Sequence, residues 1–205
     1  RFFVIYNIIS PAFLRKLAQE PADFGDSFAG PRLLTIARLS PQKGLDLALL
    51  AALILKKRGY SFRWYIIGVG PEEADLRDQA EALGLNDTVF FLGEKANPYP
   101  YVRACTVYVQ PSRFEGKSIA VDEAMALAKP ILLTDFSTAA DQIDSGKTGL
   151  IVPLSPDGIA QGLQQLLDSA SLRDSYSKSL AALDLSNEGE ISKLYDLIEG
   201  RRPPQ

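Results

Sequence analysis

The sequence predicts an α/β fold: a Rossmann-like parallel β-sheet with helices on both faces. Short, continuous apolar runs recur along the chain, and they lack the polar alternation of a strand with one exposed face. A longer segment with helical spacing follows most of these runs, as is typical of strands that pair in parallel. Glycines and charged side chains come directly after the runs, at the edge where sheets of this kind bind ligands.

The chain has 205 residues, of which 46% are hydrophobic, so it is long enough to form one globular domain with a sizeable core. We expect this domain to comprise residues 31–200. An interdomain strand and linker region (1–30) precedes it, and a loose tail (201–205) follows it. The sequence begins with Arg1 rather than Met, which indicates a piece of a longer product.

The region before the domain divides into a strand, a short helix and a linker. Phe2–Ile9 is almost entirely apolar and is predicted to be a strand that normally pairs near a domain junction. Here it would be an exposed edge or be covered by a second copy of the chain. A brief helix is predicted from Pro11 to Ala18. Glu20–Pro31 contains two prolines and two glycines and is predicted to be the linker.

Six strands and six helices are predicted after the linker. Local chemistry marks several helix ends: Gly59 and Gly84 stop two of them, and Pro71 with an acidic first turn starts one. The predicted strands are Leu33–Ala37, Phe62–Ile67, Val89–Leu92, Val107–Gln110, Ile131–Thr134 and Leu150–Val152. The predicted helices are Leu45–Arg58, the segment from Pro71 to Gly84, the segment that follows Glu115, Pro156–Asp168, Leu172–Ala182 and Glu188–Glu199.

Composition excludes several classes of protein and site. The net charge is −3 and the basic residues do not gather in one block, so a nucleic-acid partner is not expected. Cys105 is the only cysteine, which excludes an internal disulfide and fits a reducing compartment such as the cytoplasm. With no histidine either, a zinc site and histidine-based catalysis are excluded within this chain. The longest apolar run, Leu47–Leu55, has nine residues and is too short to span a bilayer.

The residues that follow the first three strands of the domain favour an anionic ligand. Arg38 and Lys43 lie in one loop that leads into a helix, and two cations beside free backbone N–H groups form a phosphate site. Gly68 and Gly70 follow the second strand and are expected to let a ligand approach the backbone closely. The segment after the third strand contains Gly93, Glu94 and Lys95.

The segment Ser112–Ala126 carries two carboxylates, Glu115 in a turn and Glu123 in the helix behind it. A helical wheel places Glu123 on a flank that is at least partly covered, where an ionised carboxylate must pair or bind a ligand. A structural Glu123 bonded to a neighbouring loop is the alternative. Glu115 alone could simply complement the helix dipole. The stripe predicted to face solvent contains Ser118, Asp122 and Lys129.

Two familiar nucleotide-binding motifs are incomplete. Gly116–Ser118 resembles the end of a P-loop, but Pro111 stands where that loop requires its first glycine. Gly68 and Gly70 begin a dinucleotide fingerprint, but Glu73 replaces its third glycine. The chain also has no Asp-x-Asp pair of the sort that holds a metal against a diphosphate, so a bound metal is not expected.

The motifs taken together resemble family-4 retaining glycosyltransferases of GT-B architecture, over nearly the whole chain. The spacing from Arg38 to Lys43 and from Glu115 to Glu123 is specific as a set. In chain order the matching stretches read R-L-S-P-Q-K-G, I-I-G-V-G-P, F-L-G, F-E-G-K-S-I-A-V-D-E-A-M-A-L-A-K-P-I and G-K-T-G-L-I-V. The Lys-Ser that follows Gly116 is one variant of a position that differs within that family.

The resemblance implies roles for these residues. Arg38 and Lys43 would bind the nucleotide diphosphate, Glu123 the ribose hydroxyls and Glu115 the transferred sugar. The backbone that faces the phosphates would be that of Gly116, Lys117, Ser118 and Ile119. The base would lie against Gly93, Glu94 and Lys95 and near Gly68 and Gly70.

The resemblance also implies that this chain is the C-terminal, donor-binding half of a two-domain enzyme. The partner expected is a nucleotide-diphospho-sugar (UDP, GDP or ADP), used without a cofactor or metal, in bacterial cell-surface polysaccharide or glycolipid synthesis. The acceptor-binding half would precede Arg1, and any membrane contact would occur through that half at the inner face of the cell membrane.

Three other functions compete with this interpretation. A non-catalytic nucleotide-sugar binding module would need the fold and Glu123 but not Glu115. A nucleotide-sugar epimerase on a similar GT-B scaffold would need a general acid or base, and no histidine is present. An NAD-dependent oxidoreductase would need the glycine fingerprint that this chain lacks.

Overall fold

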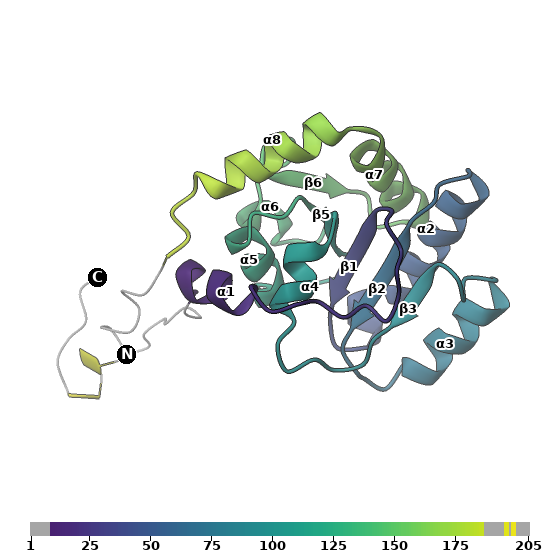
Figure 1. The fold of residues 1–205 in the computed structure, drawn as a ribbon, viewed down its shortest axis with the longest axis horizontal. Coiled ribbons are helices and arrows are strands. Elements are labelled where there is room, and N and C mark those ends of the chain that lie inside the picture. The colour runs from purple at the N-terminus through teal and green to yellow at the C-terminus, as the bar shows by residue number, and fades with distance from the viewer. Residues whose placement is uncertain (1–8, 187–194, 197, 200–205) are drawn as a thin grey trace.

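A single sheet of six parallel strands forms the centre of the protein (Figure 1). The computed structural model describes residues 9–186, 195–196 and 198–199. The strand order is β3-β2-β1-β4-β5-β6, so the order reverses between β1 and β4. The strands are β1 (Arg32–Ile36), β2 (Arg63–Ile67), β3 (Val89–Phe91), β4 (Val107–Gln110), β5 (Ile131–Thr134) and β6 (Gly149–Val152). The predicted fold class and all six domain strands are confirmed.

The helices α2, α3, α5, α7 and α8 were predicted to within a few residues, as was α1 before the domain. The short helices α4 and α6 and the 3-10 helix η1 were missed, because six, four and three residues are too few to show a helical period. The helices are α1 (Pro11–Leu17), η1 (Pro41–Lys43), α2 (Leu45–Lys57), α3 (Glu73–Ala82), α4 (Tyr99–Ala104), α5 (Ile119–Ala126), α6 (Ala139–Gln142), α7 (Pro156–Asp168) and α8 (Ala170–Ala181).

Helices cover both faces of the sheet, which explains why its strands are mostly apolar and do not alternate with polar residues. Neighbouring residues of one strand enter different cores: Leu33 packs with α2, α3 and α7, while Leu34 packs with α4, α5 and α6. Helix α8 crosses from one core to the other, since its Tyr176 belongs to the first core and its Leu180 to the second. The carboxyl ends of β1 and β4 are thereby held between two packed layers.

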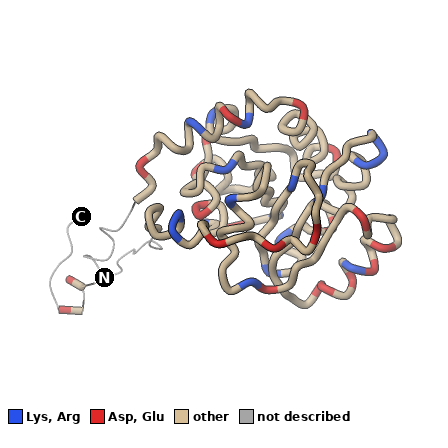
Figure 2. Tube along the Cα trace, in the orientation of Figure 1, with Lys and Arg blue, Asp and Glu red and all other residues tan. Residues whose placement is uncertain are grey.

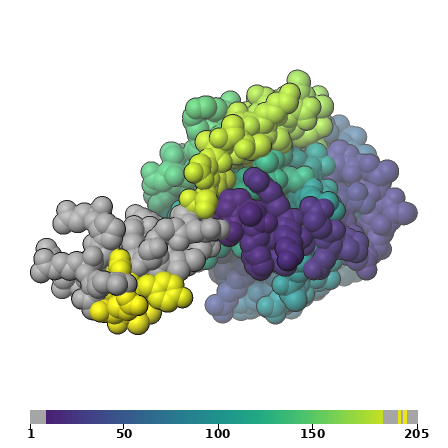
Figure 3. All heavy atoms as spheres, turned by 60° about the vertical axis from the view of Figure 1, so that its left-hand side comes forward, coloured from purple at the N-terminus to yellow at the C-terminus, as the bar shows by residue number. Residues whose placement is uncertain are grey.

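The two ends of the described body meet at one corner. Ile9 and Leu14 are buried against Ala126 of α5, and Leu185, beyond α8, packs on the same cluster. Figure 3 shows the purple N-terminal segment beside the yellow-green chain that leaves α8. Ile9 is not part of a strand.

Several predictions for the chain ends lie outside the described residues. They are the strand Phe2–Ile9 over residues 1–8, most of the helix Glu188–Glu199, and the tail 201–205.

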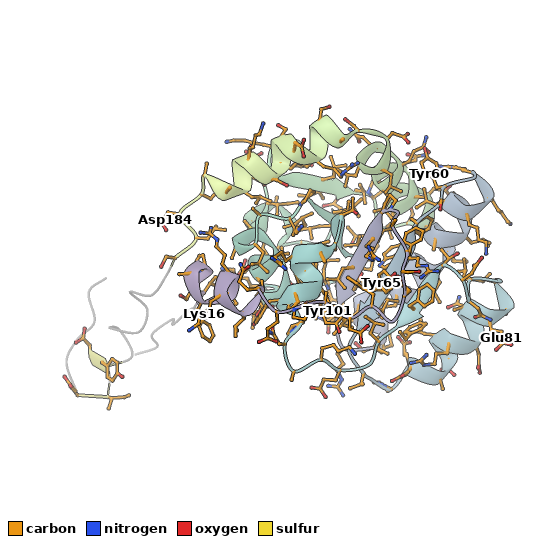
Figure 4. The ribbon with its side chains drawn as sticks, in the orientation of Figure 1. Lys16, Tyr60, Tyr65, Glu81, Tyr101 and Asp184 are labelled. Atoms are coloured by element: carbon orange, nitrogen blue, oxygen red, sulfur yellow. The ribbon has the colours of Figure 1, made fainter. Side chains whose placement is uncertain are left out.

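The segment Glu20–Pro31 has no helix or strand, as its prolines and glycines predicted, yet it is fixed firmly to the domain. The buried Phe24 ring packs against two tyrosines, with its centroid 4.4 Å from that of Tyr65 in β2 and 5.1 Å from that of Tyr101 in α4. Figure 4 labels both tyrosines. Asp26 pairs with Arg32 at 3.2 Å and with Arg63 at 2.6 Å, and the Tyr65 hydroxyl donates to it. An aromatic contact and a charge cluster therefore clamp this segment at the amino ends of β1 and β2.

The charge cluster lowers the pKa of Asp26. Burial alone would raise that pKa, but hydrogen bonds from Tyr65, the Phe28 amide and the two arginines outweigh it. Elsewhere, acidic and basic residues are interspersed over the body (Figure 2). The Asp26 cluster is thus a local concentration of paired charge, and its contribution to stability depends on pH.

We expect Asp26→Asn to lower the free energy of unfolding by about 2 kcal/mol near neutral pH, because the variant loses the charge that two guanidinium groups share. Since folding lowers the pKa of Asp26, the stabilisation is complete above the ordinary pKa of 3.8 and is lost as the pH falls below it. Urea unfolding of variant and unchanged chain at neutral and acidic pH should show the difference shrinking.

The matched control is Asp87→Asn. The ion pair of Asp87 with Lys56 is largely exposed, so its loss should cost less than about 1 kcal/mol. If the loss of unfolding free energy in Asp26→Asn stayed constant down to acidic pH, the charge of Asp26 would not be its cause.

Candidate functional site

The candidate site lies at the carboxyl ends of β1 and β4, where the strand order reverses and open α/β sheets leave room for a ligand. Two loops meet there, one from Ala37 to Gly44 and one from Pro111 to Ser118. The Arg113 guanidinium binds both carboxylate oxygens of Asp46 at 2.8 and 2.6 Å. Gln42 adds two hydrogen bonds between the loops. Its backbone carbonyl accepts from the Arg113 N–H at 2.8 Å, and its side-chain amide donates to the Phe114 carbonyl at 2.9 Å.

Gly44 permits this close approach. Its φ is +62°, and a Cβ atom there would lie 2.1 Å from the carbonyl oxygen of Pro111. Any larger residue would therefore push the two loops apart.

Lys43 and Glu115 form an ion pair across the two loops, with Nζ 2.6 Å from Oε1. The same oxygen accepts from the Ser112 hydroxyl at 2.6 Å and from the Gln110 amide at 3.1 Å. Among the described residues, Oε2 has one long contact, 3.5 Å from the Gln42 amide nitrogen. The Glu115 side chain is only 6% exposed, so one oxygen is fixed by three donors while the other retains acceptor capacity.

Arg38 stands apart from this cluster. It is exposed, and it makes no hydrogen bond or ion pair within the described part of the chain. It lines a cavity of about 670 Å³ together with Gly68, Val69, Gly70, Pro71 and Glu94. The structure therefore places the two cations that were predicted to bind phosphate in one loop but in different surroundings. Lys43 is paired with Glu115, whereas Arg38 lines an open cavity.

Gly68 and Gly70 were predicted to let a ligand approach the backbone closely, which explains only part of their role. Both line the cavity, but the backbone that approaches them is the chain's own. A Cβ at Gly68 would lie 1.9 Å from the Ala37 carbonyl oxygen, and one at Gly70 would lie 2.2 Å from that of Leu39. These glycines let the loops after β1 and β2 continue to pair beyond the strands, with Leu39 N–H bonded to the Val69 carbonyl at 3.0 Å.

The third strand end contributes one residue to the cavity. Glu94 lines it, and Gly93 has a φ of +68° with open space around it. The Lys95 ammonium lies 5.7 Å from the centre of the Tyr101 ring, so this lysine packs on α4 and is not among the cavity residues.

The predicted solvent face of α5 was wrong. Ser118 is buried and the Asp122 side chain is 14% exposed, whereas Ile119 is 44% exposed. The reason is the missed helix α6, whose Gln142 bonds to Ser118 and Asp122 and covers that stripe. Gln142 is a site residue that sequence reasoning overlooked, because four residues of helix give no periodic signal. Gly116 and Lys117 remain exposed at the tip of the turn.

Glu123 lies on a partly covered flank, as predicted, and its Oε1 accepts from the Tyr99 hydroxyl of α4 at 2.8 Å. Burial raises the pKa of Glu123, the Tyr99 bond opposes that rise, and the neighbouring Asp122 charge adds to it. Burial also raises the pKa of Tyr108, and the charges of Glu123 and Glu115 raise it further. Both carboxylates therefore act on the same buried phenol.

Comparison with known proteins decides the family. The family described as "Glycosyl transferases group 1" matches residues 26–181, well over half of the chain. The chain belongs to the group 1 glycosyltransferases. It is 30% identical to the alpha-D-kanosaminyltransferase of Streptomyces kanamyceticus over 75% of this chain and 40% of that protein. It is 34% identical to WcaL of Escherichia coli, named a putative colanic acid biosynthesis glycosyltransferase, over 69% of this chain and 36% of WcaL.

Solved structures share the fold of this group 1 glycosyltransferase chain. Anabaena HepE, solved in complex with UDP and glucose, has a TM-score of 0.78 at 21% identity, over 96% of this chain and 56% of HepE. WaaG, a glycosyltransferase involved in lipopolysaccharide biosynthesis, has a TM-score of 0.76 at 21% identity. The chain thus spans little more than half of HepE and less than half of the two sequence relatives. Within the described residues, no helix has the length and apolarity needed to cross a membrane.

We expect Gly68→Ala to lower the free energy of unfolding by about 3 kcal/mol, because its φ of +137° and the Ala37 carbonyl both exclude a methyl group. Gly116→Ala is the control: nothing lies within 4 Å of its Cβ position, so its stability should change by less than about 0.5 kcal/mol. Urea unfolding measures both. If both variants lost the same free energy of unfolding, the pairing of the loops after β1 and β2 would not depend on Gly68.

Proposed function

We propose that this chain is the C-terminal, donor-binding half of a family-4 retaining glycosyltransferase of GT-B architecture. It would bind a nucleotide-diphospho-sugar, with UDP as the first candidate, for a transfer on the cytoplasmic side in cell-surface polysaccharide or glycolipid synthesis. The observation that carries the proposal is the contact of Lys43 with Glu115 at the point of strand reversal, while Arg38 of the same loop lines an open cavity. The colanic acid relative and the UDP complex of HepE support the substrate class.

The proposed reaction breaks the bond between the anomeric carbon of the sugar and the diphosphate oxygen. Negative charge then develops on the leaving diphosphate while the sugar becomes oxocarbenium-like. The acceptor hydroxyl oxygen forms the new bond to the anomeric carbon, and its proton passes to the leaving diphosphate. Arg38, Lys43 and the first amides of α5 would stabilise the diphosphate charge, a task that a divalent ion performs in other transferases. We therefore propose a metal-independent transfer.

The carboxylates would recognise hydroxyl groups. Glu115 has one oxygen with acceptor capacity left, which suits a sugar hydroxyl as donor. Glu123 uses one oxygen for Tyr99, and its other oxygen would accept from the ribose. A carboxylate whose pKa is raised by burial gains most from such donors, because they replace the water that it lost.

The direct test is calorimetric titration of the chain with UDP, GDP and ADP. We expect weak binding of one nucleotide diphosphate and no useful transfer of sugar, because the proposed acceptor half is absent. Binding of none of the three would refute the donor-domain assignment. Efficient glycosyl transfer by this chain would refute the need for a second half.

We expect Arg38→Ala and Lys43→Ala each to weaken nucleotide diphosphate binding by about tenfold, and to reduce turnover of the two-domain enzyme by about 10²–10³-fold. Lys57→Ala is the matched control, since Lys57 is exposed at the last residue of α2, away from the carboxyl ends of the strands where the candidate site lies. Titration and initial rates measure both effects. Near-normal turnover in either site variant would count against the proposed role of that cation.

We expect Glu123→Gln to leave the chain at least as stable as before near neutral pH, while weakening its affinity for nucleotide diphosphate. Because folding raises the pKa of Glu123, its ionised form costs stability at neutral pH, and that cost disappears as the pH falls. The amide oxygen can still accept from Tyr99. Unfolding and titration of the same sample give both readouts, and a clear loss of stability would favour a purely structural Glu123.

A further inference from the structure

The segment after β5 holds both ends of the turn Glu115–Ser118. The Thr138 hydroxyl donates to the Glu115 carbonyl oxygen at 3.0 Å. Gln142 accepts from the Ser118 N–H at 3.1 Å and donates to the Ser118 carbonyl oxygen at 2.9 Å. The turn that carries Glu115 is thus tied down at its first and last residues by one neighbouring segment.

Gln142 is suited to this task by its burial and by its full set of partners. It is 8% exposed, and its amide nitrogen also donates to Asp122 Oδ1 at 3.1 Å. An amide with its oxygen and both N–H groups bonded has a single orientation, and two of these three bonds go to the backbone of one residue. Ser118 itself provides no side-chain cap for α5, so Gln142 is the group that fixes the residue from which the helix starts.

The consequence concerns the proposed phosphate site. The first backbone amides of α5 have no acceptor within the helix, and their direction follows from the conformation of Ser118. The exposed tip of the turn, Gly116 and Lys117, has open space around the glycine. A donor diphosphate bound there would meet amides already aligned, so it would not have to order the turn on binding.

We infer that Gln142 is a positioning residue for the donor diphosphate, with Thr138 as its partner at the other end of the turn. This inference rests on the proposed function. Gln142 touches neither phosphate nor sugar. It fixes the turn that presents the α5 amides on one side and the Glu115 carboxylate on the other.

The variant that tests the inference is Gln142→Met, which preserves volume but removes all three hydrogen bonds. We expect the affinity for UDP to fall by about tenfold, because two ordered backbone groups lose their partner. The affinity for uridine, which lacks phosphate, should stay within about twofold. A merely structural role would lower both affinities together. The matched control is Gln164→Met on α7, where the lost partner is Arg58 at 3.1 Å and neither affinity should change.

A second variant, Thr138→Val, removes only the bond to the Glu115 carbonyl and keeps the test valid should Gln142→Met fail to fold. We expect a smaller loss of UDP affinity, again without a loss for uridine. UDP affinities within twofold of the unchanged chain in both variants would overturn the positioning role, as would equal losses for UDP and uridine. Failure of the unchanged chain to bind any of UDP, GDP and ADP would instead overturn the proposed function, and the positioning role with it.

Discussion

The contact between the loops after β1 and β4 is the constraint on which the rest of the site depends. Parallel strands that pair side by side deliver their carboxyl ends to one edge, but they do not by themselves bring the following loops together. Here Gly44 removes the steric barrier, and Arg113 of the loop after β4 binds Asp46 in the first turn of α2 by two charged hydrogen bonds. Only then can the Lys43 ammonium reach the Glu115 carboxylate, which lies 72 positions further along the chain.

The polar groups of the site differ in how completely their partners satisfy them. Glu115 Oε1 and Gln142 have full sets of partners, so these groups are rigid before any ligand arrives. The Arg38 guanidinium and the second carboxylate oxygen of Glu123 can still form hydrogen bonds with a ligand. Such a division is expected of a binding site: groups with a full set of partners hold the geometry, and groups with unused hydrogen-bonding capacity bind the ligand.

The sheet was predictable because burial on both faces imposes the same apolar composition on every strand, as the two cores around Leu33 and Leu34 show. Contacts between segments that are distant in the sequence could not be predicted in this way. Gly68 and Gly70 look the same in sequence whether a ligand or the chain's own backbone approaches them. The polar stripe of α5 was assigned to solvent because nothing in its own sequence reveals that α6 covers it. The residue types at the site could be recognised, whereas their partners required coordinates.

The corner where Ile9 and Leu185 share one cluster has a mechanical consequence. Ile9 and Leu185 also border a small cavity with Lys117 and Asp122, so the corner adjoins the tip of the turn before α5. Because both segments pack on one apolar cluster, they would come loose together, and their release would expose to water the side of the turn that Lys117 and Asp122 border.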